Sequence, residues 1–330
     1  MSYRAMIASQ PGSVARCLEG ARSEVERIDL HPFASGLIVV TGIGASYAAA
    51  MVVAGELVRR GRRAVAMRSV DLIDSVAIAD SIIVLSHRGK SIEPVESLNA
   101  RKSTPALAIT NSPESPLAKA AGQHLRIANE LDATPSSTGY TGTLAVCGGL
   151  VDRICGGVTM DWEKLPLVVA DVLMGAAQKM PRLREHFGER RAVDCVGANA
   201  SLGTAEEAAL LLREAVHLPT GIADTRHFLH GPMEAMDART GVVLFGDGRE
   251  IRLALQVDEI GCPALLVTAN DEIDDRNLLT VMRVPAESNR IARGILDILP
   301  AQLLAAELSD AAGLTDAKFR YPQTDTKLTG

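Results

Sequence analysis

The chain alternates short apolar runs with longer segments of helical periodicity. Runs such as 83–85 and 106–109 carry no charged side chain, which is typical of parallel strands that are buried on both faces. Segments 48–60 and 205–217 have the apolar spacing of helices. Strands that alternate with helices in this way form βαβ units, so the pattern predicts an α/β fold with parallel sheets.

The same succession of elements occurs twice along the chain. Four landmarks recur in the same order at offsets of 155 to 160 residues. The matched pairs are 39–46 with 194–201, 83–86 with 243–246, 104–110 with 262–268 and 125–127 with 282–284. Repetition at a nearly constant offset predicts two copies of one domain, each a parallel-sheet αβα sandwich of the flavodoxin-like or Rossmann-like type.

The repeat also predicts the domain organisation. We expect an N-terminal helix over 1–28, a first domain over 29–160, a linking helix within 161–184, a second domain over 185–312 and an extended tail over 313–330.

Three local signals place helix ends. The linking helix is expected over 165–184 with a stop near Met180-Pro181, because proline breaks a helix interior. Thr204 and Glu207 have capping-box spacing, which predicts that a helix begins there. A further helix over 291–312 is expected to close the second domain, and the polar segment after it, with Pro322, shows no period.

Composition excludes several classes of protein. With 330 residues, of which 47% are hydrophobic, the chain can bury a large core, so a single small domain and intrinsic disorder are both excluded. The net charge is −6 and no basic run exceeds 59–63, so we expect no nucleic-acid partner. Five cysteines without a CxxC pair indicate a reducing cytoplasm and neither disulfides nor a zinc site.

Neither a signal peptide nor a membrane span is expected. Residues 1–6 lack the apolar core of a signal peptide. The stretch between Asp29 and Glu56 holds no acid, lysine or arginine and is long enough to cross a bilayer. It contains His31-Pro32 and the glycines of 42–44, however, and divides into a strand, a glycine turn and an alanine-rich helix, so no contact with a membrane is expected.

Two turns of the first domain have the chemistry of an anion site. Segments 42–46 and 86–91 follow apolar strands and combine glycine, serine and basic side chains. Ligands of parallel sheets bind beyond the carboxyl ends of the strands, where amides and helix N-termini favour anions. Tyr47 stands where a dinucleotide fingerprint needs glycine, and no Walker A motif occurs. Tight structural connections would explain either turn alone, but the pair favours a sugar phosphate.

The second domain is expected to lack an equivalent site. Its matching turn, 245–249, has no hydroxyl side chain, and Asp247 would repel a phosphate. The sequence therefore predicts one phosphate site in the chain.

Together with these turns, three further features resemble a known family: the segment 129–144 with Pro135 to Thr138, a helix that ends in Glu214, and His230-Gly231-Pro232-Met233. They are similar to the tandem sugar-isomerase (SIS) family, in particular the isomerase half of glucosamine-6-phosphate synthase and the related deaminases and deglycases. The likeness extends over about 36–327, and its most specific part is the spacing of 16 residues between Glu214 and His230.

The resemblance implies roles for individual residues. Glu214 would move the proton between C1 and C2, His230 would assist ring opening, often across a dimer interface, and Lys327 would form an imine with the sugar carbonyl. The substrate and its phosphate are expected to contact hydroxyl, amide and basic groups at Gly44, Ser46, Ser86, His87, Arg88, Ser91, Ser136, Ser137 and Thr138. Homodimers with shared sites are implied, and because the amidotransferase half is missing we expect no glutaminase activity.

The sequence departs from the family pattern at several positions. Arg88 replaces the usual hydroxyl residue and Lys90 the usual acid of the second turn, while Gly221 and Leu229 replace an acid and a lysine before the histidine. The two cations would strengthen anion binding and leave the sugar undetermined. His227 and His230 have HxxH spacing, but no further ligand follows, so neither a metal nor another cofactor is expected.

The leading hypothesis is an enzyme: a phosphosugar isomerase, deaminase or deglycase that acts on a hexose 6-phosphate. Its chemistry is coherent, because a glutamate in a dry pocket has a raised pKa and becomes a competent base. The alternatives are a protein that binds a sugar phosphate as an effector without turnover, and a structural partner of a separate glutaminase chain.

Overall fold

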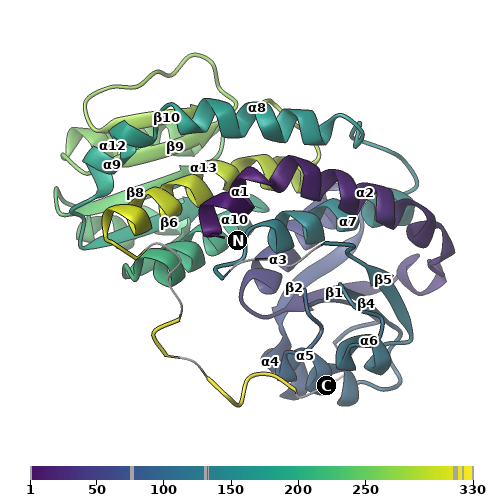
Figure 1. Ribbon diagram of the computed structural model, residues 1–330. Coiled ribbons are helices and arrows are strands. Elements are labelled where there is room, and N and C mark those ends of the chain that lie inside the picture. The colour runs from purple at the N-terminus through teal and green to yellow at the C-terminus, as the bar shows by residue number, and fades with distance from the viewer. Residues whose placement is uncertain are drawn as a thin grey trace.

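The chain forms two α/β units, each built on a parallel five-stranded sheet, as a computed structural model shows (Figure 1). The structure describes residues 2–74, 78–129, 132, 134–314, 319–321 and 323–328. The predicted fold class is therefore confirmed, whereas the exact domain boundaries remain predictions.

The first sheet has the strand order β2-β1-β3-β4-β5. Its strands are β1 (Leu37–Gly42), β2 (Arg63–Arg68), β3 (Ser81–Leu85), β4 (Ala106–Thr110) and β5 (Gln123–Arg126). Every residue of β3 and β4 is buried, as expected for uncharged strands covered on both faces. The connecting helices are α3 (Ala45–Arg59), α4 (Ser69–Asp74), α5 (Ile92–Asn99) and α6 (Pro116–Ala120).

The second sheet repeats this topology, with the order β10-β9-β8-β6-β7. Its strands are β6 (Ala192–Gly197), β7 (Thr220–Asp224), β8 (Thr240–Phe245), β9 (Ala264–Thr268) and β10 (Leu279–Arg283). The helical segments around it are α10 (Ser201–Leu211), the π-helical turn η2 (Leu212–Val216), α11 (Thr225–Phe228), the 3₁₀ turn η3 (Pro232–Ala235) and α12 (Arg249–Glu259). Numbered within each half, both sheets have the flavodoxin-like order 2-1-3-4-5, which agrees with the sequence repeat.

The helices outside the two repeats differ from the predicted ones in three places. The N-terminal segment forms α1 (Tyr3–Ala8) and α2 (Gln10–Arg27), followed by the 3₁₀ turn η1 (His31–Phe33). The linker forms two helices, α8 (Leu165–Ala177) and α9 (Met180–Phe187). Helix α8 thus ends at Ala177, close to the predicted stop at Met180-Pro181, and Pro181 itself lies in the first turn of α9, where no proline N–H is needed.

The predicted capping box is wrong. Helix α10 begins at Ser201, so Thr204 and Glu207 lie inside the helix, fully buried. Neither the Thr204 hydroxyl nor the Glu207 carboxylate has a hydrogen-bond partner within the described part of the chain. The S/T-x-x-E spacing is typical of a helix N-terminus, but α10 begins three residues before Thr204, so both side chains lie in its buried interior.

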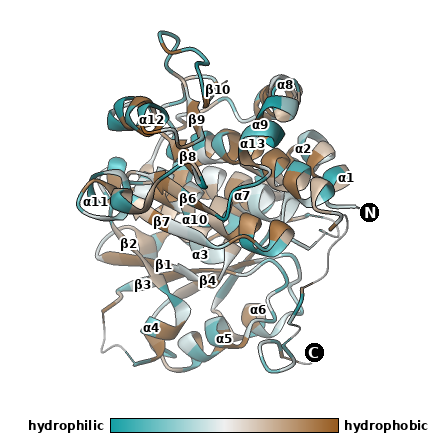
Figure 2. Cartoon of the chain, turned by 90° about the vertical axis from the view of Figure 1, so that its left-hand side faces the viewer, coloured by the Kyte–Doolittle hydropathy of each residue, from teal (hydrophilic) through white to brown (hydrophobic). Residues whose placement is uncertain are grey.

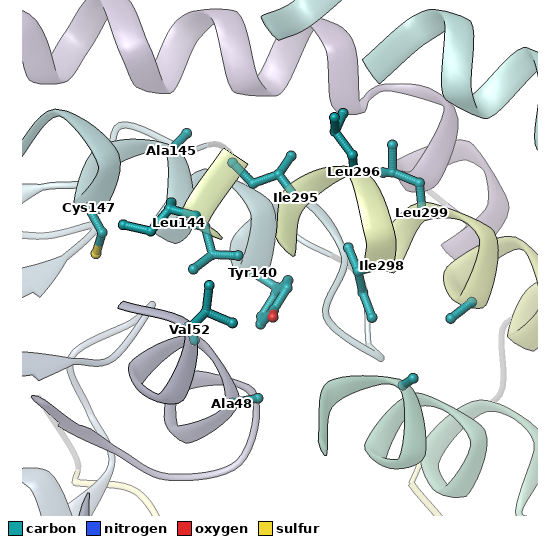
Figure 3. Packing of buried hydrophobic residues seen from close by; sticks show 14 of the residues in the cluster. Ala48, Val52, Tyr140, Leu144, Ala145, Cys147, Ile295, Leu296, Ile298 and Leu299 are labelled. Carbon is teal, nitrogen blue, oxygen red and sulfur yellow. The ribbon is translucent and has the colours of Figure 1, made fainter. Parts of the chain in front are cut away.

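Helix α13 (Arg290–Ala311) does more than close the second domain. It packs against α10 and α8, and also against α7 (Thr138–Cys155) and α3 of the first half. Figure 3 shows Ile295 and Ile298 of α13 on the side of this helix that faces Leu144 and Tyr140 of α7. One continuous apolar core therefore joins the two halves and fixes their relative position.

Hydropathy follows the layers of the fold. In Figure 2 the inner strands of both sheets are largely apolar and the outer loops largely polar. Within the described residues, no helix combines the length and the apolar character needed to cross a bilayer. The described parts of the tail, 319–321 and 323–328, are extended and run from the second half to the turn before α5 (Figure 1).

Candidate functional site

A cavity of about 360 Å³ lies where the carboxyl ends of β1 and β3 meet α10, η2 and the tail. Its lining combines the two predicted turns of the first half with carboxylates of the second half and a lysine of the tail. The predicted site residues in the lining are Gly44, Ser46, Ser86, His87, Arg88, Ser91, Ser136, Glu214 and Lys327. The structure thus brings together most of the residues that the sequence singled out.

The first turn depends on two glycines. Gly44 has φ +57°, which side-chain-bearing residues rarely adopt, and a Cβ at Gly42 would lie 2.7 Å from the carbonyl carbon of Ser46. This tight turn places Ser46 in the first turn of α3, so its hydroxyl and the helix N-terminus face the cavity. The arrangement favours an anion.

The second turn contributes hydroxyl and cationic groups. Ser86 follows β3 and Ser91 precedes α5, and both side chains are buried at the cavity. Gly89 has φ +63° and approaches Ser115 so closely that a Cβ would collide with it. Arg88 and Lys90 are exposed at the cavity, and neither has a carboxylate partner among the described residues. Both cations are therefore available to an anionic ligand.

Glu214 reaches the cavity from the π-helical turn η2. Burial raises the pKa of its carboxyl group to about 7. A π-turn widens the helix by one residue, and such turns are frequent at functional sites. At neutral pH the carboxyl group therefore exchanges a proton readily, as a general base requires.

Glu207 also lines the cavity, and the sequence analysis missed its place there. It is fully buried, both carboxylate oxygens are unpartnered within the described residues, and burial together with nearby Glu214 and Asp132 raises its pKa well above the usual value. It lies seven residues before Glu214, and this spacing on one helix face was the signal available. Because Glu207 was interpreted as part of a capping box, its position in the cavity was not predicted.

Lys327 enters the cavity from the tail. Its Nζ donates a hydrogen bond to Ser91 Oγ at 2.6 Å, and the backbone of the two residues forms an antiparallel bridge. Burial lowers the pKa of the Lys327 ammonium group, an effect that Glu93 opposes and Arg88 reinforces. A lysine with a lowered pKa has a larger share of the nucleophilic neutral amine.

Of the predicted residues Ser136, Ser137 and Thr138, only Ser136 lines the cavity. Asp132 accepts hydrogen bonds from the hydroxyls of Ser136 and Ser137 and from the amides of Ser137 and Gly139. Ser137 and Thr138 are fully buried and outside the cavity lining. In this structure the two buried residues hold the start of α7 in place.

His230 does not lie in this cavity of its own chain. It is exposed in the loop between α11 and η3 and is absent from the cavity lining.

The corresponding turn of the second half is occupied by an ion pair. Asp247 accepts hydrogen bonds from Arg293 Nη1 at 2.7 Å, Thr268 Oγ1 at 2.8 Å and the amide of Ala269. Partial burial raises the pKa of Asp247, but Arg293 and the amide outweigh it and hold the pKa near 2. The Asp247 carboxylate therefore occupies this turn, and the single phosphate site stays a prediction.

Two further features of the structure bear on the site. Within the described residues, no group of three or more His, Cys, Asp or Glu side chains is arranged to hold a metal ion. A larger cavity of about 890 Å³ lies between α2, α7 and the loop 156–163, and it contains none of the predicted site residues.

The fold and the cavity define a double α/β protein with one candidate anion-binding cavity between its two halves. Residues 34–151 match the model of the SIS domain, which confirms the resemblance seen in the sequence.

Curated relatives point the same way. The chain is 22% identical over 329 residues to a glutamine–fructose-6-phosphate aminotransferase [isomerizing] of Sulfolobus acidocaldarius, covering 95% of this chain and 54% of that protein. It is 27% identical over 216 residues to the protein of that name from Oceanobacillus iheyensis, covering 61% and 35%. The chain thus spans about half the length, or less, of these relatives.

Solved structures share the fold. The C-terminal domain of glucosamine-fructose-6-phosphate aminotransferase from Francisella tularensis superposes with a TM-score of 0.81 at 17% identity, over 97% of this chain and 98% of that one. Glucosamine-6-phosphate deaminase from Thermotoga maritima gives 0.80 at 18%, over 97% and 98%. Tagatose-6-phosphate ketose/aldose isomerase from Escherichia coli gives 0.76 at 17%, over 98% and 96%. At such identities the likeness establishes the fold alone.

Proposed function

We propose that the protein is an enzyme that acts on a hexose 6-phosphate, or on its amino or glycated derivative, by moving a proton between C1 and C2. The observation that carries the proposal is the position of Glu214: its carboxyl group, with a pKa near 7, lines the same cavity as the two serine turns. A base and an anion site that share one cavity suit a substrate with a phosphate at one end and a carbonyl at the other.

The phosphate is held by the first half of the chain. Ser46, Ser86 and Ser91 supply hydroxyl donors, and Arg88 supplies charge. Binding energy from the phosphate, far from the reacting carbons, positions the open-chain sugar for proton transfer.

Glu214 then removes the proton from the carbon next to the carbonyl. The electrons of the broken C–H bond form the carbon–carbon double bond of an enediolate, with the negative charge on the former carbonyl oxygen. The proton of the neighbouring hydroxyl group then passes to that oxygen, and the protonated Glu214 returns its proton to the former carbonyl carbon, which completes the aldose–ketose exchange. In a deaminating or deglycating variant of the reaction, Lys327 would form an imine with the sugar carbonyl, releasing water.

Ring opening is assigned to His230 of a partner subunit, because His230 of the same chain lies outside the cavity. The proposal therefore includes a homodimer with shared sites.

The decisive experiment follows hydrogen exchange in D₂O by NMR, at C2 of glucose 6-phosphate and glucosamine 6-phosphate and at C1 of fructose 6-phosphate. Exchange with at least one of them is expected in the wild type and not in Glu214→Gln. The matched control is Glu206→Gln, which removes a carboxylate from the same helix outside the cavity lining. Exchange that survives Glu214→Gln would overturn the base assignment.

The same samples separate the enzyme from the effector-binding alternative. A ligand present at 100 times its dissociation constant stabilises the fold by roughly 2.7 kcal/mol, so binding is visible as a higher melting temperature. A shift with all three sugars but no exchange with any of them would favour a binding protein without turnover.

A further inference from the structure

The imidazole of His87 is held in the cavity by two other elements. Its Nε2 is 3.2 Å from Nδ2 of Asn129, in the segment between β5 and α7. The ring also lies close to the start of α7, because Cδ2 of His87 would be 3.3 Å from a Cβ added at Gly139. Nδ1 has no hydrogen-bond partner in the part of the chain that the structure describes. This nitrogen is therefore the one left for a ligand.

The amide of Asn129 is oriented by contacts on both sides. Asn129 is 7% exposed, and its Oδ1 accepts a hydrogen bond from Ser13 Oγ at 2.7 Å. Its Nδ2 lies 3.3 Å from Thr138 Oγ1 and 3.2 Å from His87 Nε2. An amide nitrogen only donates, so the nitrogen that faces it must carry a lone pair. In a neutral imidazole the proton then sits on Nδ1.

We propose that Asn129 is a positioning residue that holds His87 as the neutral tautomer protonated on Nδ1, and that this N–H donates to an oxygen of the sugar phosphate. The identity of the ligand rests on the proposed function, whereas the tautomer does not.

The charges around His87 agree with a neutral ring. Burial lowers the pKa of His87, Asp132 before α7 raises it, and Arg88 in the same turn lowers it, with a lowered pKa as the result. The other charged groups of the cavity are Lys90, Glu93 and Lys327 on the side of the second turn, and Glu207 and Glu214 on α10 and η2. Asn129 adds a further constraint, because an imidazolium would turn an N–H toward the amide NH₂.

A neutral donor has a functional consequence. His87 contributes a hydrogen bond to a phosphate oxygen without a charge that titrates near neutrality. The contribution of His87 to phosphate binding should therefore stay constant between about pH 6.5 and 8.

The tautomer is directly measurable in the ligand-free protein. In a sample with ¹⁵N-labelled histidine, two-bond ¹⁵N–¹H correlations distinguish the three forms of each ring, and the His87→Gln spectrum identifies the His87 signals. We expect a ring protonated on Nδ1 alone, unchanged between pH 6.5 and 8. A ring protonated on Nε2 alone, or an imidazolium at pH 7, would overturn the inference.

Two variants test the part played by Asn129. Asn129→Asp places a carboxylate at Nε2, so we expect the His87 ring to take a proton on Nε2. Thr138→Val removes the other contact of Nδ2 and should leave the His87 tautomer as in the wild type. If Asn129→Asp leaves the His87 spectrum unchanged, Asn129 does not set the tautomer. Should this variant fail to fold, the wild-type spectrum still decides.

A separate measurement tests whether His87 donates a hydrogen bond to the ligand. Inorganic phosphate or glucose 6-phosphate should shift the Nδ1 resonance of His87, and His87→Gln should weaken their binding about tenfold. Absence of that shift, in a protein that binds the ligand, removes the donor role but leaves the proposed reaction intact. A shift without any isomerisation leaves the donor role intact and counts against the reaction.

Discussion

Lys327 Nζ donates a hydrogen bond of 2.6 Å to Ser91 Oγ, although 236 residues separate the two along the chain. Through this contact the tail, which follows the last helix of the second half, lies against the second turn of the first half, residues 86–91. One cavity thus receives its hydroxyls from the first repeat, its carboxylates from the second and its amine from the tail.

Lys327 is predicted to form an imine with a keto-sugar phosphate. Borohydride added with fructose 6-phosphate should then leave a covalent adduct on Lys327, detectable by peptide mass, because reduction traps an imine. Lys327→Met should give no adduct, while Lys90→Met, the neighbouring cavity lysine, should give the wild-type adduct. An adduct on Lys90 in the wild type would contradict the assignment.

The rate of C2 exchange should rise with pH and level off above about pH 7. Glu214 has a pKa of about 7 in the folded protein, and only its ionised form accepts the proton. Exchange rates measured between pH 5 and 9 test this. A rate that falls as the pH rises from 5 to 7 would contradict a carboxylate base.

The same pKa predicts a change in stability. Because the folded state raises the pKa of Glu214 from 4.5 to about 7, its stability falls as the pH rises through this interval. Glu214→Gln removes that loss, so the variant should gain stability relative to the wild type by at most about 3 kcal/mol between pH 4.5 and 8. Urea unfolding at both pH values measures the gain, and Glu206→Gln serves as the reference.

Serine substitutions should separate ligand binding from stability. Ser46→Ala and Ser86→Ala each remove a hydroxyl donor to the phosphate and should weaken sugar-phosphate binding about tenfold. Ser137→Ala removes a hydroxyl bonded to Asp132 outside the cavity lining and should lower the free energy of unfolding by about 1 kcal/mol with little change in affinity. Calorimetric titration measures the affinity and urea unfolding the stability. If Ser137 contacts the sugar, Ser137→Ala would instead weaken sugar-phosphate binding and leave the free energy of unfolding nearly unchanged.

Mixing two inactive variants tests the shared site. If His230 of a partner subunit completes the site, Glu214→Gln and His230→Gln are each inactive alone. Random exchange of subunits then gives mixed dimers in which one of two sites is intact, so activity should return to about a quarter of the wild type. No recovery after verified subunit exchange would show that each chain works with its own residues.

Adjacent glycines of α7 should respond in opposite ways to alanine. A Cβ at Gly148 would collide with the ring of Trp162, so Gly148→Ala should destabilise the protein by about 1–3 kcal/mol. A Cβ at Gly149 meets nothing within 4 Å, so Gly149→Ala should stabilise the helix by up to about 1 kcal/mol. Thermal unfolding of the pair gives the comparison, and equal effects would refute the predicted packing.

Much of the architecture was predictable because it depends on local pattern. Uncharged runs such as 83–85 had to be buried strands, and the repeat required a second sheet of the same order. The turns at Gly44 and Gly89 were recognisable because their positive φ angles favour glycine. Where patterns coincide by chance they misled: Thr204 and Glu207 have the spacing of a cap but lie within a buried helix.

The sequence by itself determined the two parallel sheets, the two turns that favour an anion, and the residue types needed for proton transfer. Only the tertiary structure decided which of them meet: Glu207 joins Glu214 in the cavity, Ser137 and Thr138 are buried beside it, and His230 lies outside it. The reason is physical. Strand and turn formation depend on neighbouring residues, whereas the contents of the cavity depend on how α13 packs the two halves together.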